Sequence, residues 1–277
     1  MKWHGAGNDF ILMKAQDLVG YGEHNLSELA VKMCHRQIGV GADGIMVVFP
    51  SVLADFKMVY YNSDGSYAAM CGNGIRCFAA FCAYERLLEK NDFTVETGDG
   101  IKSIHINTEN GYEVTVEMGT PVLTFSKMPT TMEDCGLGLN KLQVEDLCLK
   151  VDVMKVGVPH TVVDLEDLVF SEKDFRKYGS LIEKMTIFPE GTNVNFVKKS
   201  HDGTLRVDTW ERGAGLTLAC GTGVCASAYS YYRRGLVELP VSVEVAGGVL
   251  QIDIIEDKIY MTGPAKPITK GFFLMEA

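Results

Sequence analysis

Two cysteines of this chain, Cys71 and Cys220, each open a Cys-Gly-x-Gly motif. Small and apolar residues follow both motifs in a pattern that predicts a helix beginning directly after each cysteine. A helix N-terminus carries partial positive charge and unpaired N–H groups, so it stabilises a thiolate and lowers a thiol pKa from about 8.5. Glycine also lets backbone N–H groups approach a bound anion closely. The repeated motif therefore predicts two activated thiols beside a carboxylate site.

Two thiols on opposite faces of one carbon atom can invert its configuration. One cysteine, as thiolate, removes the α-proton, and the other, as thiol, delivers a proton to the opposite face. Backbone N–H groups stabilise the charge that develops on the carboxylate. The expected donors are those of Gly72, Asn73, Gly221 and Thr222. This chemistry needs no cofactor and no metal. The spacing of the eight cysteines agrees with this expectation, because they include no C-x-x-C pair and no cluster at zinc spacing.

Residues beside Cys220 carry both charges that would recognise an amino acid. Arg212 can bind a carboxylate through two parallel hydrogen bonds, and Glu211 can accept an ammonium group. A structural salt bridge is the alternative interpretation of this pair. Asn62 stands at the corresponding place before Cys71 and is the better ligand candidate there, because the Asp-Gly pair that follows is typical of a turn.

Three further polar residues are candidates that also have an ordinary structural explanation. His160 could influence the ionisation of a thiol, although a single histidine is more often a satisfied structural residue. Asn8 and Asn193 lie in glycine-led turns at the start of predicted strands, where turn formation is the default explanation. The cysteines within the predicted helices are expected to pack in the core: Cys77, Cys82 and Cys225.

The composition excludes several classes of partner. The chain has 277 residues, 47% of them hydrophobic and 22% charged, which is enough to bury a substantial core. A net charge of −10 argues against nucleic acid, whose phosphates require a basic face. No stretch approaches the roughly 20 apolar residues of a membrane span, and the first residues lack the apolar region of a signal peptide. We therefore expect a cytoplasmic protein whose cysteines are mostly free thiols.

Apolar periodicity predicts four helices. One covers residues 25–37, a second reaches from 171 to about 185 on the outer surface, and two begin after Cys71 and Cys220. The last two are apolar on nearly all sides, which is typical of a helix enclosed by other elements. Strands are predicted at 10–13, 45–49, 112–117, 205–210 and 250–254.

These elements predict an α/β (α+β) fold of two pseudo-symmetric domains. Each domain is expected to be a curved mixed β-sheet or barrel wrapped around one central buried helix, with the active site in the cleft between the domains. The expected N-terminal domain comprises residues 1–118 and 263–277 and carries Cys71. The expected C-terminal domain comprises residues 119–262 and carries Cys220.

The chain resembles the diaminopimelate epimerases in eight segments that follow one another in the order of that family. These segments are 4–10, 39–43, 62–65, 71–77, 159–160, 191–194, 211–215 and 219–223. The resemblance implies a pyridoxal-independent isomerase that interconverts LL- and meso-2,6-diaminopimelate in lysine and peptidoglycan precursor biosynthesis. It also implies a homodimer that needs no cofactor.

The resemblance further implies a role for each matched residue. In one direction Cys71 is the proton donor and Cys220 the proton acceptor, and the roles exchange in reverse. His160 and Glu211 tune the pKa of the thiols. The implied substrate-binding residues are Asn8, Asn62, Gly72, Asn73, Asn193, Glu211, Arg212, Gly221 and Thr222.

Two positions depart from the family pattern. Many members have Gln where this chain has Gly44, and Asn where it has Val158. Each change removes a side-chain hydrogen bond that would reach the distal end of diaminopimelate, at a cost on the order of 1 kcal/mol if the partner stays unpaired. A racemase of the same architecture that acts on another amino acid is therefore the nearest alternative.

A redox protein that regulates a disulfide between Cys71 and Cys220 is a more distant alternative. Thiols of low pKa held close together oxidise readily, so such a disulfide could also form as an inactivated state. This interpretation leaves Glu211, Arg212 and the asparagines without a role.

Overall fold

The computed structural model describes residues 1–18, 25–132, 139–166 and 168–274, so Cys135 lies outside the described residues. The chain divides into two compact units. Unit 1 comprises Met1–Val116 and Thr262–Ala277, and unit 2 comprises Glu117–Met261.

Unit 1 contains a closed barrel of eight strands. They are β1 (Lys2–Gly5), β2 (Asn8–Lys14), β3 (Gly44–Phe49), β4 (Phe56–Asn62), β6 (Asp92–Thr97), β7 (Gly100–Asn107), β8 (Tyr112–Gly119) and β17 (Lys258–Thr269). The pairs β2–β3 and β4–β6 are parallel, and the ring closes where β17 pairs with both β1 and β8. A short strand, β5 (Tyr67–Ala68), pairs with β4 and leads toward Cys71.

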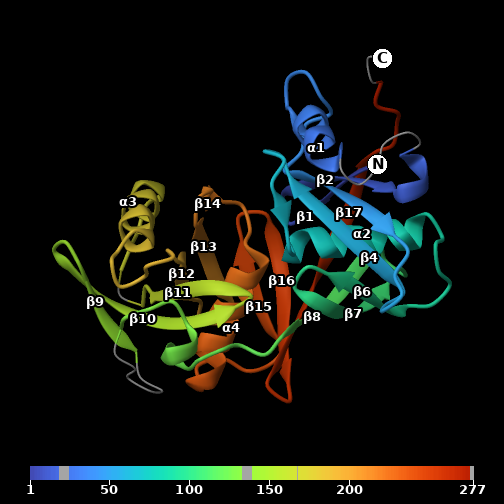
Figure 1. Ribbon diagram of the computed structural model, residues 1–277. Coiled ribbons are helices and arrows are strands. Elements are labelled where there is room, and N and C mark those ends of the chain that lie inside the picture. Colours follow the sequence, from blue (N-terminus) through green and yellow to red (C-terminus); the bar gives the residue numbers. More distant parts are fainter. Residues whose placement is uncertain (19–24, 133–138, 167, 275–277) are drawn as a thin grey trace. The chain divides into compact units, whose positions relative to one another are not determined.

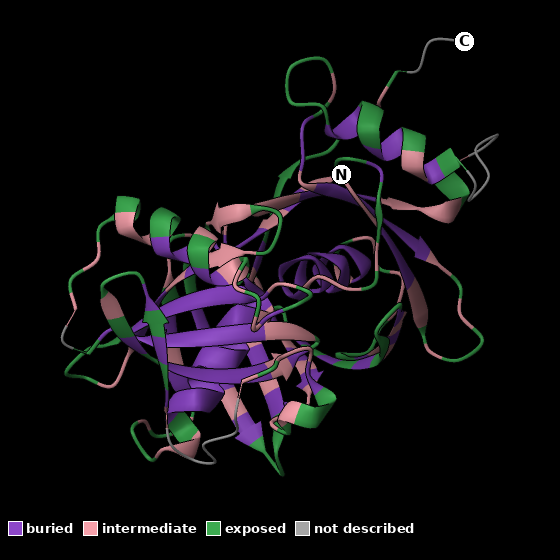
Figure 2. Ribbon diagram, turned by 60° about the vertical axis from the view of Figure 1, so that its left-hand side comes forward, coloured by how far each residue is buried: buried purple, intermediate pink, exposed green. Residues whose placement is uncertain are grey.

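The central helix of unit 1 is α2 (Gly72–Tyr84), which contacts β1, β2, β3 and β7. Figure 2 shows it as a buried helix surrounded by strands. Every residue from Gly72 to Cys82 is buried, as expected for a helix without a polar face. Side chains such as Phe78 and Phe81 each contribute roughly 1.5–3 kcal/mol by leaving water. This burial stabilises a helix whose glycine-rich first turn has poor intrinsic propensity.

Unit 2 repeats this plan with a curved mixed sheet. Its strands, in spatial order, are β9 (Asn140–Val144), β10 (Leu147–Val156), β11 (Val158–Asp164), β12 (Asn193–Lys199), β13 (Leu205–Glu211), β15 (Val241–Val245) and β16 (Gly248–Ile255). The short β14 (Gly215–Thr217) pairs with β13. The central helix α4 (Gly221–Arg233) contacts every strand from β10 to β13 as well as β15 and β16. The predicted α/β class, with sheets wrapped around central helices, is therefore confirmed.

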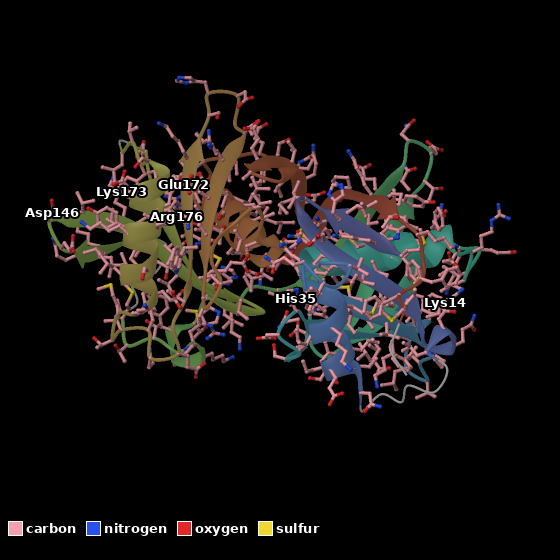
Figure 3. All side chains as sticks on the ribbon, turned by 90° about the horizontal axis from the view of Figure 1, so that it is seen from above. Lys14, His35, Asp146, Glu172, Lys173 and Arg176 are labelled. Carbon is pink, nitrogen blue, oxygen red and sulfur yellow. The ribbon has the colours of Figure 1, made fainter. Side chains whose placement is uncertain are left out.

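Two outer helices connect the parallel strand pairs: α1 (Leu26–Cys34) joins β2 to β3, and α3 (Glu172–Glu183) joins β11 to β12 (Figure 1). Ser171 and Asp174 form a capping box at the start of α3. The outer face of α3 is charged, and Arg176 donates to Glu172 one turn earlier (2.7 Å; Figure 3). The predicted helix at 171–185 is thus confirmed, with its end two residues earlier.

The predicted helix at 25–37 is too long at its C-terminus. The helix ends at Cys34, and the backbone at His35 is already extended. The carbonyl of Met33 instead accepts hydrogen bonds from the N–H groups of Val40 and Gly41, which fold back over the helix end. Gly41 has a φ of 75°, a conformation that favours glycine. The predicted apolar face, from Leu26 to Cys34, is buried.

The two units follow one order of elements at nearly constant spacing. In both, the strand before the outer helix pairs in parallel with the strand after it, at Phe10–Gly44 in β2–β3 and at His160–Asn193 in β11–β12. Both central helices have 13 residues, and 149 residues separate their starts at 72 and 221. The same spacing separates the starts of β4 and β13, at 56 and 205. Each residue near Cys71 therefore has a counterpart near Cys220.

Candidate active site in two halves

Cys71 occupies the N-cap of α2. Its backbone is extended, and its Sγ accepts a hydrogen bond from the N–H of Gly74 (3.4 Å). This contact satisfies one of the unpaired donors of the helix N-terminus and directs its partial positive charge at the sulfur. The side chain is half-buried, whereas Gly72 and Asn73 behind it are buried. The structure thus confirms the predicted helix start at this thiol.

A chain of hydrogen bonds fixes the polar side chains behind Cys71. Asn73 donates to Oδ1 of Asn8 (2.5 Å), and Nδ2 of Asn8 donates to Asp43 (3.1 Å). On the other side, the fully buried Arg76 donates to Oδ1 of Asn73 and to the carbonyl of Gly72, both at 3.1 Å. Each amide therefore has a defined orientation, and the predicted Asn8 and Asn73 lie together.

Cys220 occupies the N-cap of α4 and is more enclosed than Cys71, with 5% of its surface exposed. Its Sγ lies 3.5 Å from Oγ1 of Thr222. Burial raises the pKa of the Cys220 thiol well above its usual value, and the nearby Glu211 carboxylate raises it further. The Thr222 hydroxyl and the N–H of Gly223 lower the pKa, but they do not outweigh burial. The lowered pKa predicted from the helix N-terminus is therefore wrong for Cys220 in the free protein, where burial dominates and the thiol keeps its proton at neutral pH.

His160 belongs to a buried polar cluster beneath Cys220. Its Nδ1 lies 3.1 Å from Nδ2 of Asn195, and Oδ1 of Asn195 accepts a hydrogen bond from Thr209 (3.1 Å). All three side chains are at most 2% exposed. Burial lowers the pKa of His160 to about 3, although the Val156 carbonyl and Asn195 oppose that shift. The imidazole is therefore neutral over the physiological pH range.

The turn between β13 and β14 presents Glu211 and Arg212. Oδ1 of Asn193 accepts from the N–H of Arg212 (2.8 Å), and the guanidinium donates to the carbonyl of Glu190 (2.6 Å). Glu211 accepts a hydrogen bond from Thr217 (2.6 Å). The predicted Asn193, Glu211 and Arg212 therefore lie together at one edge of unit 2.

The carboxylate of Glu183, the last residue of α3, holds this turn through two hydrogen bonds. It accepts from the indole N–H of Trp210 (2.6 Å) and from the N–H of Gly213 (3.1 Å). Gly213 has a φ of 78°, which suits glycine at this bend. A Cβ added at Gly179 would lie 2.6 Å from the Trp210 ring, so α3 packs directly on the indole.

Several of these supporting residues were not among the sequence-based candidates: Asp43, Arg76, Glu183, Asn195 and Thr209. Asn195 is the one that the sequence could have indicated, because it follows Asn193 by two positions and strand alternation places both on one face. The others depend on strand register and helix packing, which the motifs do not encode.

The described residues hold no group of three or more His, Cys, Asp or Glu side chains that could bind a metal ion. Within the described part of the chain, none of the helices has the length and apolar character needed to span a membrane.

Comparison with known proteins identifies the family. The model of the diaminopimelate epimerase family matches residues 1–124 and 153–268. A diaminopimelate epimerase of Alkaliphilus metalliredigens is 45% identical over 276 residues, covering 99% of this chain and 96% of the relative. One of Methanococcus maripaludis is 38% identical and covers 98% and 97% of the two chains.

Solved structures show that other proteins share the fold. A PhzF-family phenazine biosynthesis protein of Bacillus anthracis aligns with a TM-score of 0.70 at 18% identity, covering 99% of this chain and 98% of that one. A hydroxyproline epimerase of Agrobacterium vitis aligns with a TM-score of 0.66 at 17% identity, covering 98% and 90%. At 17–18% identity these structures show a shared fold only. The family model and the more similar sequence relatives show the family. The chain belongs to the diaminopimelate epimerase family.

Proposed function

We propose that this protein interconverts LL- and meso-2,6-diaminopimelate, with Cys71 and Cys220 as the two proton-transfer groups. The observation that carries this proposal is the pair of cysteines at the N-caps of two central helices, in a chain whose relatives are named diaminopimelate epimerase. The mechanism requires both half-sites to act on one substrate molecule.

The proton transfers balance without a further reactant. The thiolate of Cys220 removes the α-proton, and the electron pair of the broken C–H bond is delocalised into the α-carboxylate. The thiol of Cys71 then gives its proton to the opposite face of the same carbon. The N–H groups at 72, 73, 221 and 222 stabilise the charge on the carboxylate. The reaction leaves Cys71 as thiolate and Cys220 as thiol, which is the form that starts the reverse reaction.

Substrate binding changes the electrostatics of Cys220 in this proposal. Glu211 is the second cause of the raised pKa of this thiol, after burial. An ammonium group bound to Glu211 neutralises that carboxylate and lowers the pKa of the thiol, since an opposing negative charge is removed. His160 stays neutral throughout and acts as a fixed dipole rather than as a charged base.

The remaining candidates bind the two ends of the substrate. Arg212 receives a carboxylate, and Asn8, Asn62 and Asn193 complete the polar surroundings. The hydrogen bonds that already orient these residues reduce the entropy that is lost on binding.

A racemase of another amino acid is the second candidate function, and the residues at 44 and 158 favour it. Val158 begins β11 and has no side-chain donor or acceptor. A Cβ at Gly44 would lie 2.5 Å from the carbonyl oxygen of Tyr61, so the backbone here leaves no room for a side chain and hence for a polar one. A substrate with a smaller distal group would need fewer hydrogen bonds at these positions.

Incubation of the purified protein with LL-diaminopimelate, a reductant and no added cofactor distinguishes the two functions. We expect meso product, and we expect Cys71→Ala and Cys220→Ala to abolish its formation. Exchange of α-protons in another amino acid, without conversion of diaminopimelate, would favour the second function. Full activity in either cysteine variant would contradict the mechanism.

A cytoplasmic location and a homodimeric assembly are further parts of this proposal. Both rest on the sequence and on membership of the family. Light scattering during size-exclusion chromatography tests the assembly, for which we expect twice the 30.4 kDa chain mass.

A further inference from the structure

The Tyr60 ring occupies the space that a side chain at position 44 would take, next to Asn62. In the register of β3 and β4, Gly44 lies opposite Asn62, and Met46 lies opposite Tyr60. A Cβ added at Gly44 would lie 2.6 Å from Cε2 of Tyr60, well inside the closest approach of real side chains. The Tyr60 ring therefore lies over Gly44, where only glycine leaves room for it.

The Tyr60 ring is held firmly in this place. Only 6% of the residue is exposed, and the ring packs edge-on against Phe10 with centroids 6.0 Å apart. Its hydroxyl lies 2.6 Å from Oδ1 of Asn62. A buried, rigid ring that ends in a short hydrogen bond can fix the side chain that it contacts.

The direction of the hydrogen bonds at Asn62 follows from Asp64. The pKa of this carboxyl is lowered by hydrogen bonds from the hydroxyl and N–H of Ser66, so Asp64 is ionised and accepts both (2.6 and 2.9 Å). The single hydroxyl proton of Ser66 is therefore used, and Ser66 accepts from Nδ2 of Asn62 (3.0 Å). Oδ1 of Asn62 must then face Tyr60, whose hydroxyl donates to it.

This orientation leaves a defined donor on Asn62. Of its two amide N–H groups, one is used by Ser66, and no contact within the described residues uses the other. The residue is half-buried, so the second N–H remains accessible. An amide that presents N–H rather than C=O suits a carboxylate oxygen, which can only accept.

We propose that Tyr60 is a positioning residue of this enzyme, whose ring lies over Gly44 and whose hydroxyl turns the amide of Asn62 so that it donates to a substrate carboxylate. The inference rests on the proposed function, because it takes Asn62 as a substrate-binding residue.

A double-mutant cycle of Tyr60→Phe and Asn62→Ala tests this inference with LL-diaminopimelate as substrate. Tyr60→Phe removes one hydroxyl and keeps the ring over Gly44, and we expect a KM that rises roughly three- to tenfold with kcat changed less than twofold. In the Asn62→Ala background the same change should alter KM by less than twofold if the Tyr60 hydroxyl acts on substrate binding through Asn62. Tyr61→Phe is the matched control, because Tyr61 lies on the opposite face of β4. We expect it to leave KM unchanged.

Ser66→Ala provides a second variant whose folding is not at risk, because Ser66 is exposed. We expect it to raise KM in the wild-type background and to have no effect in Asn62→Ala. Equal increases of KM from Tyr60→Phe with and without Asn62, or no increase beyond that of Tyr61→Phe, would overturn the inference and leave the proposed function intact. A wild-type protein that does not convert diaminopimelate would refute the proposed function and this inference with it.

Discussion

The two units share one order of elements but differ in what lies beneath the first turn of the central helix. In unit 1, Met46 faces Gly74 of α2 and lies opposite Tyr60 in the register of β3 and β4, and the Tyr60 ring packs against Phe10. In unit 2, the residue at the matching position is Asn195, which faces Gly223 of α4.

The neighbours of Asn195 differ in the same way. His160 and Thr209 occupy the places of Phe10 and Tyr60, and both hydrogen bond to Asn195. One thiol therefore stands over a largely apolar layer and the other over a polar cluster. The repeat provides equivalent helix N-termini, and the divergence of the layer beneath them provides different environments for the two thiols.

A second difference lies at the opposite ends of the central helices. In unit 1, Lys14 at the end of β2 pairs with Glu85 after α2 (3.0 Å). In unit 2, Asp164 at the end of β11 pairs with Arg234 after α4 (2.9 Å). The polarity is reversed but the connection is conserved between the units, so this position requires a salt bridge between strand and helix rather than a particular charge.

The two units share a cysteine at the N-cap of the central helix, and its loss should have the strongest effect on activity. Replacing either thiol, by Cys71→Ala or Cys220→Ala, should lower kcat/KM by about 10³-fold or more, because each removes one of two proton-transfer groups. Steady-state kinetics under reducing conditions measures the loss. Cys82→Ala is the matched control, since Cys82 is a buried cysteine of α2 away from the helix start. A large loss for one thiol only would indicate a single-base mechanism.

Met46 and Asn195 occupy matching positions beneath the two Cys-Gly-x-Gly motifs, and exchanging them tests whether the polar cluster of unit 2 matters for catalysis. Asn195→Met gives unit 2 the residue of unit 1, and we expect kcat to fall roughly 10- to 100-fold through loss of the His160 contact. Unfolding free energy should fall by about 1–3 kcal/mol, because buried polar groups lose their partner. The reciprocal Met46→Asn should destabilise the protein to a similar extent but lower kcat by less than fivefold. Equal losses of kcat would show that the polar cluster has no special role.

The buried His160 of unit 2 predicts a pH dependence of stability. The folded-state pKa of His160 is about 3, below the ordinary value of 6.5, so the unfolded chain binds a proton that the folded one does not. The contribution of neutral His160 to the free energy of unfolding is complete above pH 6.5 and is lost as the pH falls toward 3. Over this range the free energy of unfolding falls by up to about 1.4 kcal/mol per pH unit. Urea titrations of His160→Asn should have a shallower decline over this range.

The control for that titration is His201→Asn, since His201 is exposed in the turn between β12 and β13. Its decline should match that of the wild type. An unchanged slope in His160→Asn would mean that the imidazole is not held neutral in the folded protein.

The smallest effect is expected from the two charge pairs. Asp164→Asn should cost about 2 kcal/mol of unfolding free energy, because it leaves Arg234, whose side chain is only 12% exposed, without its carboxylate. Glu85→Gln should cost less than about 1 kcal/mol, since Lys14 and Lys270 can reach water. Chemical denaturation of both variants measures the difference. A greater cost for Glu85→Gln would contradict the assignment of the more buried pair to unit 2.

The sequence predicted the elements that local patterns determine. The central helices were recognisable because a Cys-Gly-x-Gly start and an all-round apolar segment occur together, and all five predicted strands lie within observed strands. The end of α1 was wrong, because the chain that caps it folds back from Val40 and Gly41, which helical periodicity does not reveal. The expected domain boundaries at 118–119 and 262–263 stay a prediction.

The candidate site was predictable only where a residue belongs to a motif. Cys71, Asn73 and Thr222 follow from the repeat itself. Tyr60 and Asn195 depend on strand register, which decides what faces the second glycine of each motif. Their roles emerge only when the matching positions of the two units are compared.

We expect two different thiols to serve the two faces of one α-carbon, and deuterium incorporation from D2O at low conversion separates this mechanism from one that uses a single base. LL-diaminopimelate is converted in D2O to a few per cent of completion, and mass spectrometry measures deuterium in the substrate and the product separately. We expect about one deuterium in each meso molecule and almost none in the remaining LL substrate, because the donor thiol has exchanged with solvent and the acceptor thiol has not returned a proton. Equal label in substrate and product, or meso product that retains the original proton, would contradict it.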